Sequence, residues 1–293
     1  LRPQRLRVRV LFVVDEEQIS RGIHAATQDR ADFLAGVRLA ISADTGGTRW
    51  ESREKTAPVK LIVGRLGRFG LEIVVSGIPG HSAELDRHRW DDPIALSAAV
   101  VDTIESHRET LVRTHPDLGT GDFAWERLES RRSHGFTAAR SVRSGMHWFA
   151  FPGEQIAHVA TRLQTIVRDA LEARGLADPT RIQIRPAPRA TPYATGFVTP
   201  PRHPLVRLIQ RQMRSQLDTP IPISTGRSVA DENVLAPALP RNAIALNLGP
   251  VGGNLHTAQE WLHPEAPAAA ATLYRDLISR FDENPNELMQ LTA

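Results

Sequence analysis

The sequence has no cysteine, only two lysines and few aromatic residues. Without cysteine there can be no disulfide, no thiolate nucleophile and no cysteine-ligated metal. Apart from Lys55 and Lys60, the basic residues are arginines, which are spread along the chain and often lie beside aspartate or glutamate. No basic stripe interleaved with aromatic residues is present, so we expect no nucleic-acid partner.

Long apolar runs are also missing. No run approaches the roughly 18 residues that would predict a membrane span, and the sequence shows no secretory signal pattern. Hydrophobic residues make up 41% and charged residues 24% of the 293 residues, with a net charge of +3. These values are typical of a globular protein of one large or two modest domains. We therefore expect a cytoplasmic protein with no membrane partner.

Acidic residues follow two predicted strands near the start of the chain. Residues 6–14 form an apolar run that predicts a buried strand, followed directly by Asp15, Glu16 and Glu17. A helix is predicted over 20–34 and a second strand over 37–43, followed by Asp44. Ligands bind at the carboxyl ends of strands in open α/β sheets. Taken alone, such acids are more often helix caps or solvated turn residues.

The middle of the chain alternates differently. The pattern predicts six elements in the order strand, helix, strand, strand, helix, strand, at 70–77, 93–107, 134–143, 146–151, 154–174 and 180–187. This order is that of a ferredoxin-like α+β domain. Residues 107–133 are interpreted as an insertion without assigned structure.

The last section returns to an α/β pattern. It predicts a helix at 205–217, short strands at 221–224 and 243–248, and a final helix at 267–281. The predicted fold is therefore an α/β catalytic domain, built from residues 1–58 and 189–293, with a ferredoxin-like domain inserted at 59–188.

Four motifs occur in order along the chain. They are DEE-x-x-S-x-G from Asp15, Asp44 after its strand, G-x-x-G-H-S around His81, and GPVGGNLHTAQE around His256. Carboxylates and a histidine on a glycine-rich loop are suitable ligands for a metal that activates water. With these motifs the chain resembles the M20 family of zinc metallopeptidases, which includes aminoacylases, carboxypeptidases and deacylases.

The resemblance implies a role for each motif. Glu16 would be the general base, and Glu17, Asp44 and His256 would bind zinc. His81 would stabilise the oxyanion, either in its own chain or across a dimer. The supporting acids would be Asp15, Glu260 and Asp231. Two zinc ions are expected, with cobalt or manganese as alternatives. The implied substrate is a dipeptide or an N-acyl amino acid, and the implied oligomer is a homodimer through a ferredoxin-like lid.

The chain departs from the family at its beginning. The family carries an H-x-D motif and a bridging aspartate in a leading part of the catalytic domain that this sequence lacks. The one H-x-D string here, His115 to Asp117, lies in the insertion, which itself weakly resembles the arginine-utilisation branch. Three alternatives stay open: a longer enzyme, a single-metal site, or an inactive homologue that acts as a dimeric binding or interaction protein.

Overall fold

The computed structural model describes residues 3–45, 57–86, 90–131, 135–217 and 223–292. The chain divides into two compact units. The first unit contains Leu1–Leu66 and Gly196–Ala293, and the second contains Gly67–Thr195. Each unit has its own buried hydrophobic cluster.

The first unit is built around a mixed β-sheet in the order β1-β11-β2-β10, with β9 also paired to β2. Strand β1 is parallel to β11 and β10 is parallel to β2, whereas β11 and β2 are antiparallel. The elements of this unit are α1 (Arg21–Asp29), α2 (Ala31–Leu34), β1 (Leu39–Ser42), β2 (Val59–Arg65), β9 (Phe197–Val198), α6 (Pro204–Leu217), β10 (Ile223–Gly226), α7 (Asp231–Leu235), η4 (Ala236–Ala238), β11 (Ile244–Pro250), β12 (Gly252–Gly253), β13 (Trp261–Leu262), α8 (Ala266–Glu283) and α9 (Pro285–Leu291).

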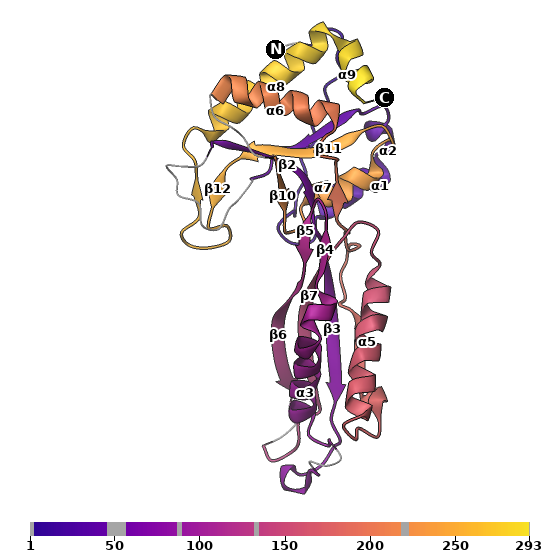
Figure 1. Cartoon of the computed structure of the whole chain (residues 1–293). Coiled ribbons are helices and arrows are strands. Elements are labelled where there is room, and N and C mark those ends of the chain that lie inside the picture. The colour runs from indigo at the N-terminus through magenta and orange to yellow at the C-terminus, as the bar shows by residue number, and fades with distance from the viewer. Residues whose placement is uncertain (1–2, 46–56, 87–89, 132–134, 218–222, 293) are drawn as a thin grey trace. The chain divides into compact units, whose positions relative to one another are not determined.

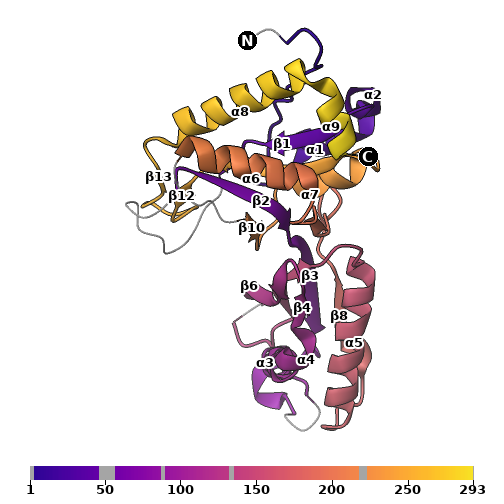
Figure 2. The same ribbon diagram turned by 45° about the horizontal axis from the view of Figure 1, so that its top comes forward.

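Helices α6 and α8 lie side by side on this sheet (Figure 1; Figure 2). Each buries an apolar stripe at helical spacing. The stripe of α6 contains Leu205, Leu208, Ile209 and Met213, and that of α8 contains Ala270, Leu273, Leu277 and Phe281. These side chains pack with the apolar residues of β2 and β11 into one core. This core fixes the two strands whose ends carry part of the candidate site.

The strand predicted over 6–14 is wrong. Residues 7–13 have no regular secondary structure, and Val10, Phe12 and Val14 are 65%, 93% and 71% exposed. Apolar alternation favours a strand only where a neighbouring strand supplies hydrogen bonds, and none of the described strands pairs with this segment. It is held instead at its start, where the Asp282 carboxylate accepts the backbone N–H groups of residues 4–6.

The helix predicted over 20–34 is divided in two. Helix α1 ends at Asp29 and α2 begins at Ala31. Arg30 between them has a non-helical backbone, with φ of −128° and ψ of 43°.

None of the helices in the described part of the chain is long and apolar enough to cross a bilayer.

The second unit is a four-stranded antiparallel sheet in the order β6-β7-β3-β8. Together with helices α3 and α5 this is the ferredoxin-like arrangement, which confirms the predicted fold class. The elements of this unit are β3 (Gly67–Ser76), η1 (Ser82–Glu84), α3 (Pro93–Ser106), α4 (Arg108–Leu111), β4 (Arg113–His115), β5 (Gly119–Gly121), β6 (Phe123–Arg131), β7 (Ser141–Ala150), α5 (Ile156–Glu172), η3 (Pro179–Arg181) and β8 (Ile182–Pro186).

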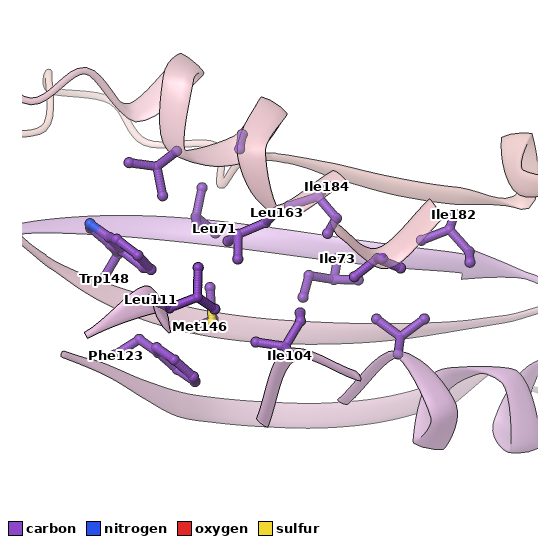
Figure 3. Close-up of a cluster of buried hydrophobic side chains, with 14 of the residues drawn as sticks. Leu71, Ile73, Ile104, Leu111, Phe123, Met146, Trp148, Leu163, Ile182 and Ile184 are labelled. Carbon is purple, nitrogen blue, oxygen red and sulfur yellow. The ribbon is translucent and has the colours of Figure 1, made fainter. Parts of the chain in front are cut away.

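The core of this unit lies between the sheet and its two helices. Figure 3 shows Leu71 and Ile73 of β3, Met146 and Trp148 of β7 and Leu163 of α5 pointing into one cluster. The strand residues alternate inward and outward, whereas the buried residues of α5 recur every four positions. The inward residues of the strands and the buried residues of the helix therefore meet in one layer, so the helices cover one face of the sheet.

The position of the second strand differs from the prediction. It is β6, at Phe123–Arg131, within the segment interpreted as an insertion. Residues 135–140 are not in a strand, and the predicted strands at 134–143 and 146–151 are replaced by one strand, β7, at Ser141–Ala150. Strand β6 lies at the edge of the sheet, and its residues 126–130 are exposed. An exposed edge strand has little apolar alternation, so its sequence resembled a loop.

Candidate functional site

The DEE motif forms a tight turn ahead of α1. The backbone N–H of Ser20 donates to the carbonyl of Asp15 at 2.7 Å, and that of Gly22 donates to the carbonyl of Val14 at 3.1 Å. Asp15 and Ser20 have positive φ angles of 67° and 53°. A side chain at Gly22 would place its Cβ 2.5 Å from the Val14 nitrogen, so only glycine fits there. This turn presents Asp15, Glu16 and Glu17 together.

Asp44 is held against the end of β11. Because β1 and β11 run parallel, the residues that follow β1 pass directly beside Gly249. A Cβ at Gly249 would lie 1.8 Å from the Asp44 carbonyl oxygen, and the Asn247 side-chain amide donates to that oxygen at 3.0 Å. The Asp44 carboxylate itself accepts the Thr45 N–H at 2.7 Å. Gly249 therefore leaves room for the Asp44 backbone, and the Asn247 amide holds it in place.

His256 comes together with Glu17. Its Nδ1 atom lies 3.6 Å from the Oε2 atom of Glu17, and both side chains are exposed. His256 has a positive φ of 64°, in a loop where Asn254 also has one of 54°. The Glu260 carboxylate accepts the backbone N–H of His256 at 3.2 Å, which ties the two ends of this loop together.

Carboxylates crowd around Glu16. Burial, followed by the nearby charges of Asp44, Asp231, Glu17 and Glu232, raises the pKa of Glu16 from 4.5 to about 7. Burial also raises the pKa of Asp231, from 3.8 to about 6, although a hydrogen bond from Ser20 acts in the opposite direction. The first unit thus gathers five acids from three separate segments into one negatively charged site.

One cation of this site was not predicted from the sequence. Arg65, at the end of β2, lies with its Nε atom 3.3 Å from the Glu232 Oε1 atom and its Nη2 atom 3.6 Å from the Asp44 Oδ2 atom. The side chains of Arg65 and Glu232 are 9% and 1% exposed. Arg65 passes over Gly226, where a Cβ would lie 2.8 Å from its Cγ atom. The sequence signal that could have revealed Arg65 is its position inside the apolar string KLIVGRLG.

The donors can be compared with what a metal requires. Carboxylate oxygens and an imidazole nitrogen are zinc ligands, and Glu17 and His256 supply one of each. Three further carboxylate oxygens, Asp15 Oδ2, Asp231 Oδ1 and Glu232 Oε2, are buried without a hydrogen-bond partner. Buried oxygens without hydrogen bonds in a crowded acidic site fit a cation chemically. Among the described residues, however, no three His, Asp or Glu side chains are close enough together to hold one.

His81 belongs to the second unit. It precedes the short helix η1, and its Nδ1 atom accepts the Ala83 N–H at 3.1 Å. The H-x-D string is also in this unit, where the Nδ1 atom of His115 accepts the N–H groups of Asp117 and Leu118 at 3.1 and 3.3 Å. His115 therefore caps a turn after β4.

Sequence comparisons place these motifs in a known family. A sequence profile described as "Peptidase family M20/M25/M40" matches residues 1–280. A succinyl-diaminopimelate desuccinylase of Xanthomonas oryzae pv. oryzae is 28% identical over 222 residues, covering 75% of this chain and 53% of that protein. The enzyme of the same name from Xylella fastidiosa is 28% identical over 273 residues, covering 92% and 65%. The chain spans about half the length of the first of these relatives.

Solved structures share the fold. The di-peptidase Dug1p of Saccharomyces cerevisiae aligns with a TM-score of 0.63 at 11% identity, covering 92% of this chain and 64% of that chain. The aminopeptidase PepT of Bacillus cereus aligns with a TM-score of 0.61 at 15% identity, covering 91% and 62%. At these identities the likeness concerns the fold alone.

Proposed function

This chain belongs to peptidase family M20/M25/M40, and we propose that it is a metal-dependent hydrolase of an amide or peptide bond in a small substrate. The substrate class would be a dipeptide or an N-acyl amino acid. The observation that carries the proposal is the 3.6 Å contact between Glu17 and His256, which come from opposite ends of the sequence. The desuccinylases among its relatives are consistent with this chemistry.

Glu17, Asp44 and His256 would hold the metal. Glu17 and His256 are already 3.6 Å apart, and Asp44 is close enough to Glu16 to raise its pKa. We propose zinc, with two ions in the complete site, and cobalt or manganese as possible substitutes. When bound, such an ion polarises the amide carbonyl and makes water a better nucleophile at neutral pH.

Glu16 would be the general base. Its carboxylate lies beside Glu17 on the same turn but is more enclosed, so the two adjacent residues can have different tasks. It would take a proton from the attacking water and deliver it to the leaving amine. Asp15, Asp231 and Glu260 would support this arrangement. Of these, Glu260 holds the backbone of His256, and Asp231 accepts a hydrogen bond from Ser20.

His81 would donate a hydrogen bond to the oxyanion formed during attack. We propose that it does so across a homodimer formed through the ferredoxin-like unit. The competing candidate is an inactive dimeric binding protein. It is favoured by one observation, which is that no three described metal-binding side chains converge.

A hydrolysis assay separates the two candidates. The purified protein is incubated with N-succinyl and N-acetyl amino acids and with dipeptides, with added zinc or with a chelator. We expect zinc-dependent release of free amine that the chelator abolishes. Release that survives the chelator would contradict the metal role, and no release from any member of the panel, with zinc bound, would favour the binding protein.

A further inference from the structure

We propose that Phe136 and the backbone N–H of Ala83 together fix the orientation of the His81 imidazole and its tautomer, with the proton on Nε2. Phe136 is then a positioning residue for His81. This inference rests on the proposed function, because it concerns the histidine assigned to the oxyanion. It draws only on contacts within the second unit.

The backbone around His81 is paired to the segment that carries Phe136. Gly77 donates its N–H to the Arg140 carbonyl at 2.9 Å, and Ala138 donates to the Gly80 carbonyl at 3.0 Å. Ser82 donates to the Phe136 carbonyl at 2.9 Å, and His81 forms an antiparallel bridge with Thr137. The G-x-x-G-H-S loop is therefore held in register against residues 136–140. This pairing places the two rings side by side.

The hydrogen bond to Nδ1 decides the tautomer. His81 is the N-cap of η1, with φ of −73° and ψ of 136°, and its Nδ1 atom accepts the Ala83 N–H at 3.1 Å. A backbone N–H can only donate, so Nδ1 must carry the lone pair. In the neutral ring the proton is then on Nε2, and Nε2–H is the one polar group of the ring left to donate elsewhere.

Phe136 limits the rotation of the ring. Its centroid lies 6.2 Å from that of the His81 imidazole, and the two planes are 12° apart. Phe136 is nevertheless 79% exposed, so its ring does not contribute to the core. Offset stacking is one of the two arrangements that aromatic pairs favour over a direct face-to-face sandwich. An exposed phenylalanine here is therefore explained by its contact with His81.

The consequence concerns the direction of one N–H bond. An oxyanion donor works when it is already aimed at the position where charge develops, and removing one such donor typically costs about 10²–10³-fold in rate. The cap from Ala83 and the stack with Phe136 would fix the plane of the imidazole before substrate arrives. Loss of either contact should leave His81 in place but misdirected.

The first test uses nitrogen-15 NMR of the histidine side chains in the full chain, which needs no substrate or metal. At pH 8 we expect His81 to show one dominant tautomer with the proton on Nε2. Ala83→Pro removes the donor and should give a mixture of tautomers, whereas Ala83→Ser keeps the N–H and should match the wild type. A wild-type mixture, or an unchanged Ala83→Pro spectrum, would overturn the tautomer assignment.

The second test removes only the exposed ring, which leaves folding intact. Phe136→Ala should lower kcat about 10-fold with KM nearly unchanged, and Phe136→Tyr should restore it. His81→Ala should lower kcat further. If His81→Ala leaves turnover unchanged, the oxyanion role itself fails. If His81→Ala is inactive but Phe136→Ala retains both full kcat and the wild-type His81 spectrum, the role of Phe136 is overturned.

Discussion

The Oε2 atom of Glu17 lies 3.6 Å from the Nδ1 atom of His256, although these residues come from opposite ends of the chain. Each is positioned by a separate feature of the backbone. Glu17 is on the turn that Gly22 closes against Val14, and His256 is on a loop tied by Glu260. Two exposed side chains brought together in this way are available to an ion from solvent.

The first prediction from this contact concerns the affinity for zinc. Glu17→Gln and His256→Gln should each weaken zinc binding by more than about 10-fold, since even an outer partner of a metal ligand is worth that much. Isothermal titration with zinc measures the effect. His263→Gln is the matched control, because His263 instead accepts a backbone N–H from Glu265. Equal zinc affinity in all four proteins would contradict the assignment.

The buried pair of Arg65 and Glu232 predicts a non-additive effect on stability. Arg65→Met leaves Glu232 buried without its partner and should lower the free energy of unfolding by about 3–5 kcal/mol. Replacing both, as Arg65→Met with Glu232→Leu, should recover most of that loss. Urea unfolding of the two single variants and the double variant gives the coupling. Simple additivity of the three values would rule out this account of the pair.

Much of the fold could be predicted because its elements have strong internal patterns. Helix α5 repeats an apolar position every fourth residue, and β3 alternates, so both were located from the sequence. The predictions for residues 6–14 and for strand β6 failed for opposite reasons. The first is apolar but has no described strand beside it, whereas the second is exposed yet pairs along β7. Pairing depends on neighbours, which local patterns do not contain.

A larger residue at position 249 is expected to have a steric effect next to the site. Gly249→Ala would place a methyl group 1.8 Å from the Asp44 carbonyl oxygen, so either β11 or the Asp44 loop must shift. We expect a loss of about 1–3 kcal/mol in unfolding free energy, as for overpacked cores. Gly135→Ala is the control, because no atom lies within 4 Å of a Cβ there. Equal melting temperatures of the two variants would contradict this role.

The environment of Glu72 predicts how the stability of the second unit changes at acidic pH. Its side chain is 4% exposed, and Arg185 and Arg143 lie 2.7 and 3.2 Å from its oxygens. Hydrogen bonding from Arg185 is the main cause that lowers the pKa of Glu72 below its ordinary 4.5. Because the folded pKa is the lower one, the stabilisation is complete above pH 4.5 and declines as the pH falls through the folded pKa.

The measurement is unfolding of Glu72→Gln against pH. At pH 7 we expect this variant to be less stable than the wild type by about 1.5–3 kcal/mol, the usual contribution of hydrogen bonds to a charged group. Below pH 4.5 the difference should shrink. Glu172→Gln, at an exposed position of α5, should follow the wild type throughout. A difference that stays constant with pH would argue against ionised Glu72 as its source.

The candidate site was predictable only in part. Glu16, Glu17, Asp44 and His256 stand in motifs whose order along the chain could be recognised. Arg65 and the burial of Glu232 could not, because an arginine among many gives no signal until the fold brings its guanidinium beside Asp44. The contact between His81 and Phe136 was missed for a similar reason, since it depends on the register of two paired loops.

In the proposed reaction, Glu16 moves the proton while Glu17, Asp44 and His256 hold the metal. The most direct measurement is turnover and zinc content of Glu16→Gln beside the wild type, under identical conditions. The account predicts that turnover is abolished and that the amount of bound zinc stays near the wild-type value. Retained turnover would contradict the general-base role, and loss of zinc together with turnover would mean that Glu16 is itself a ligand.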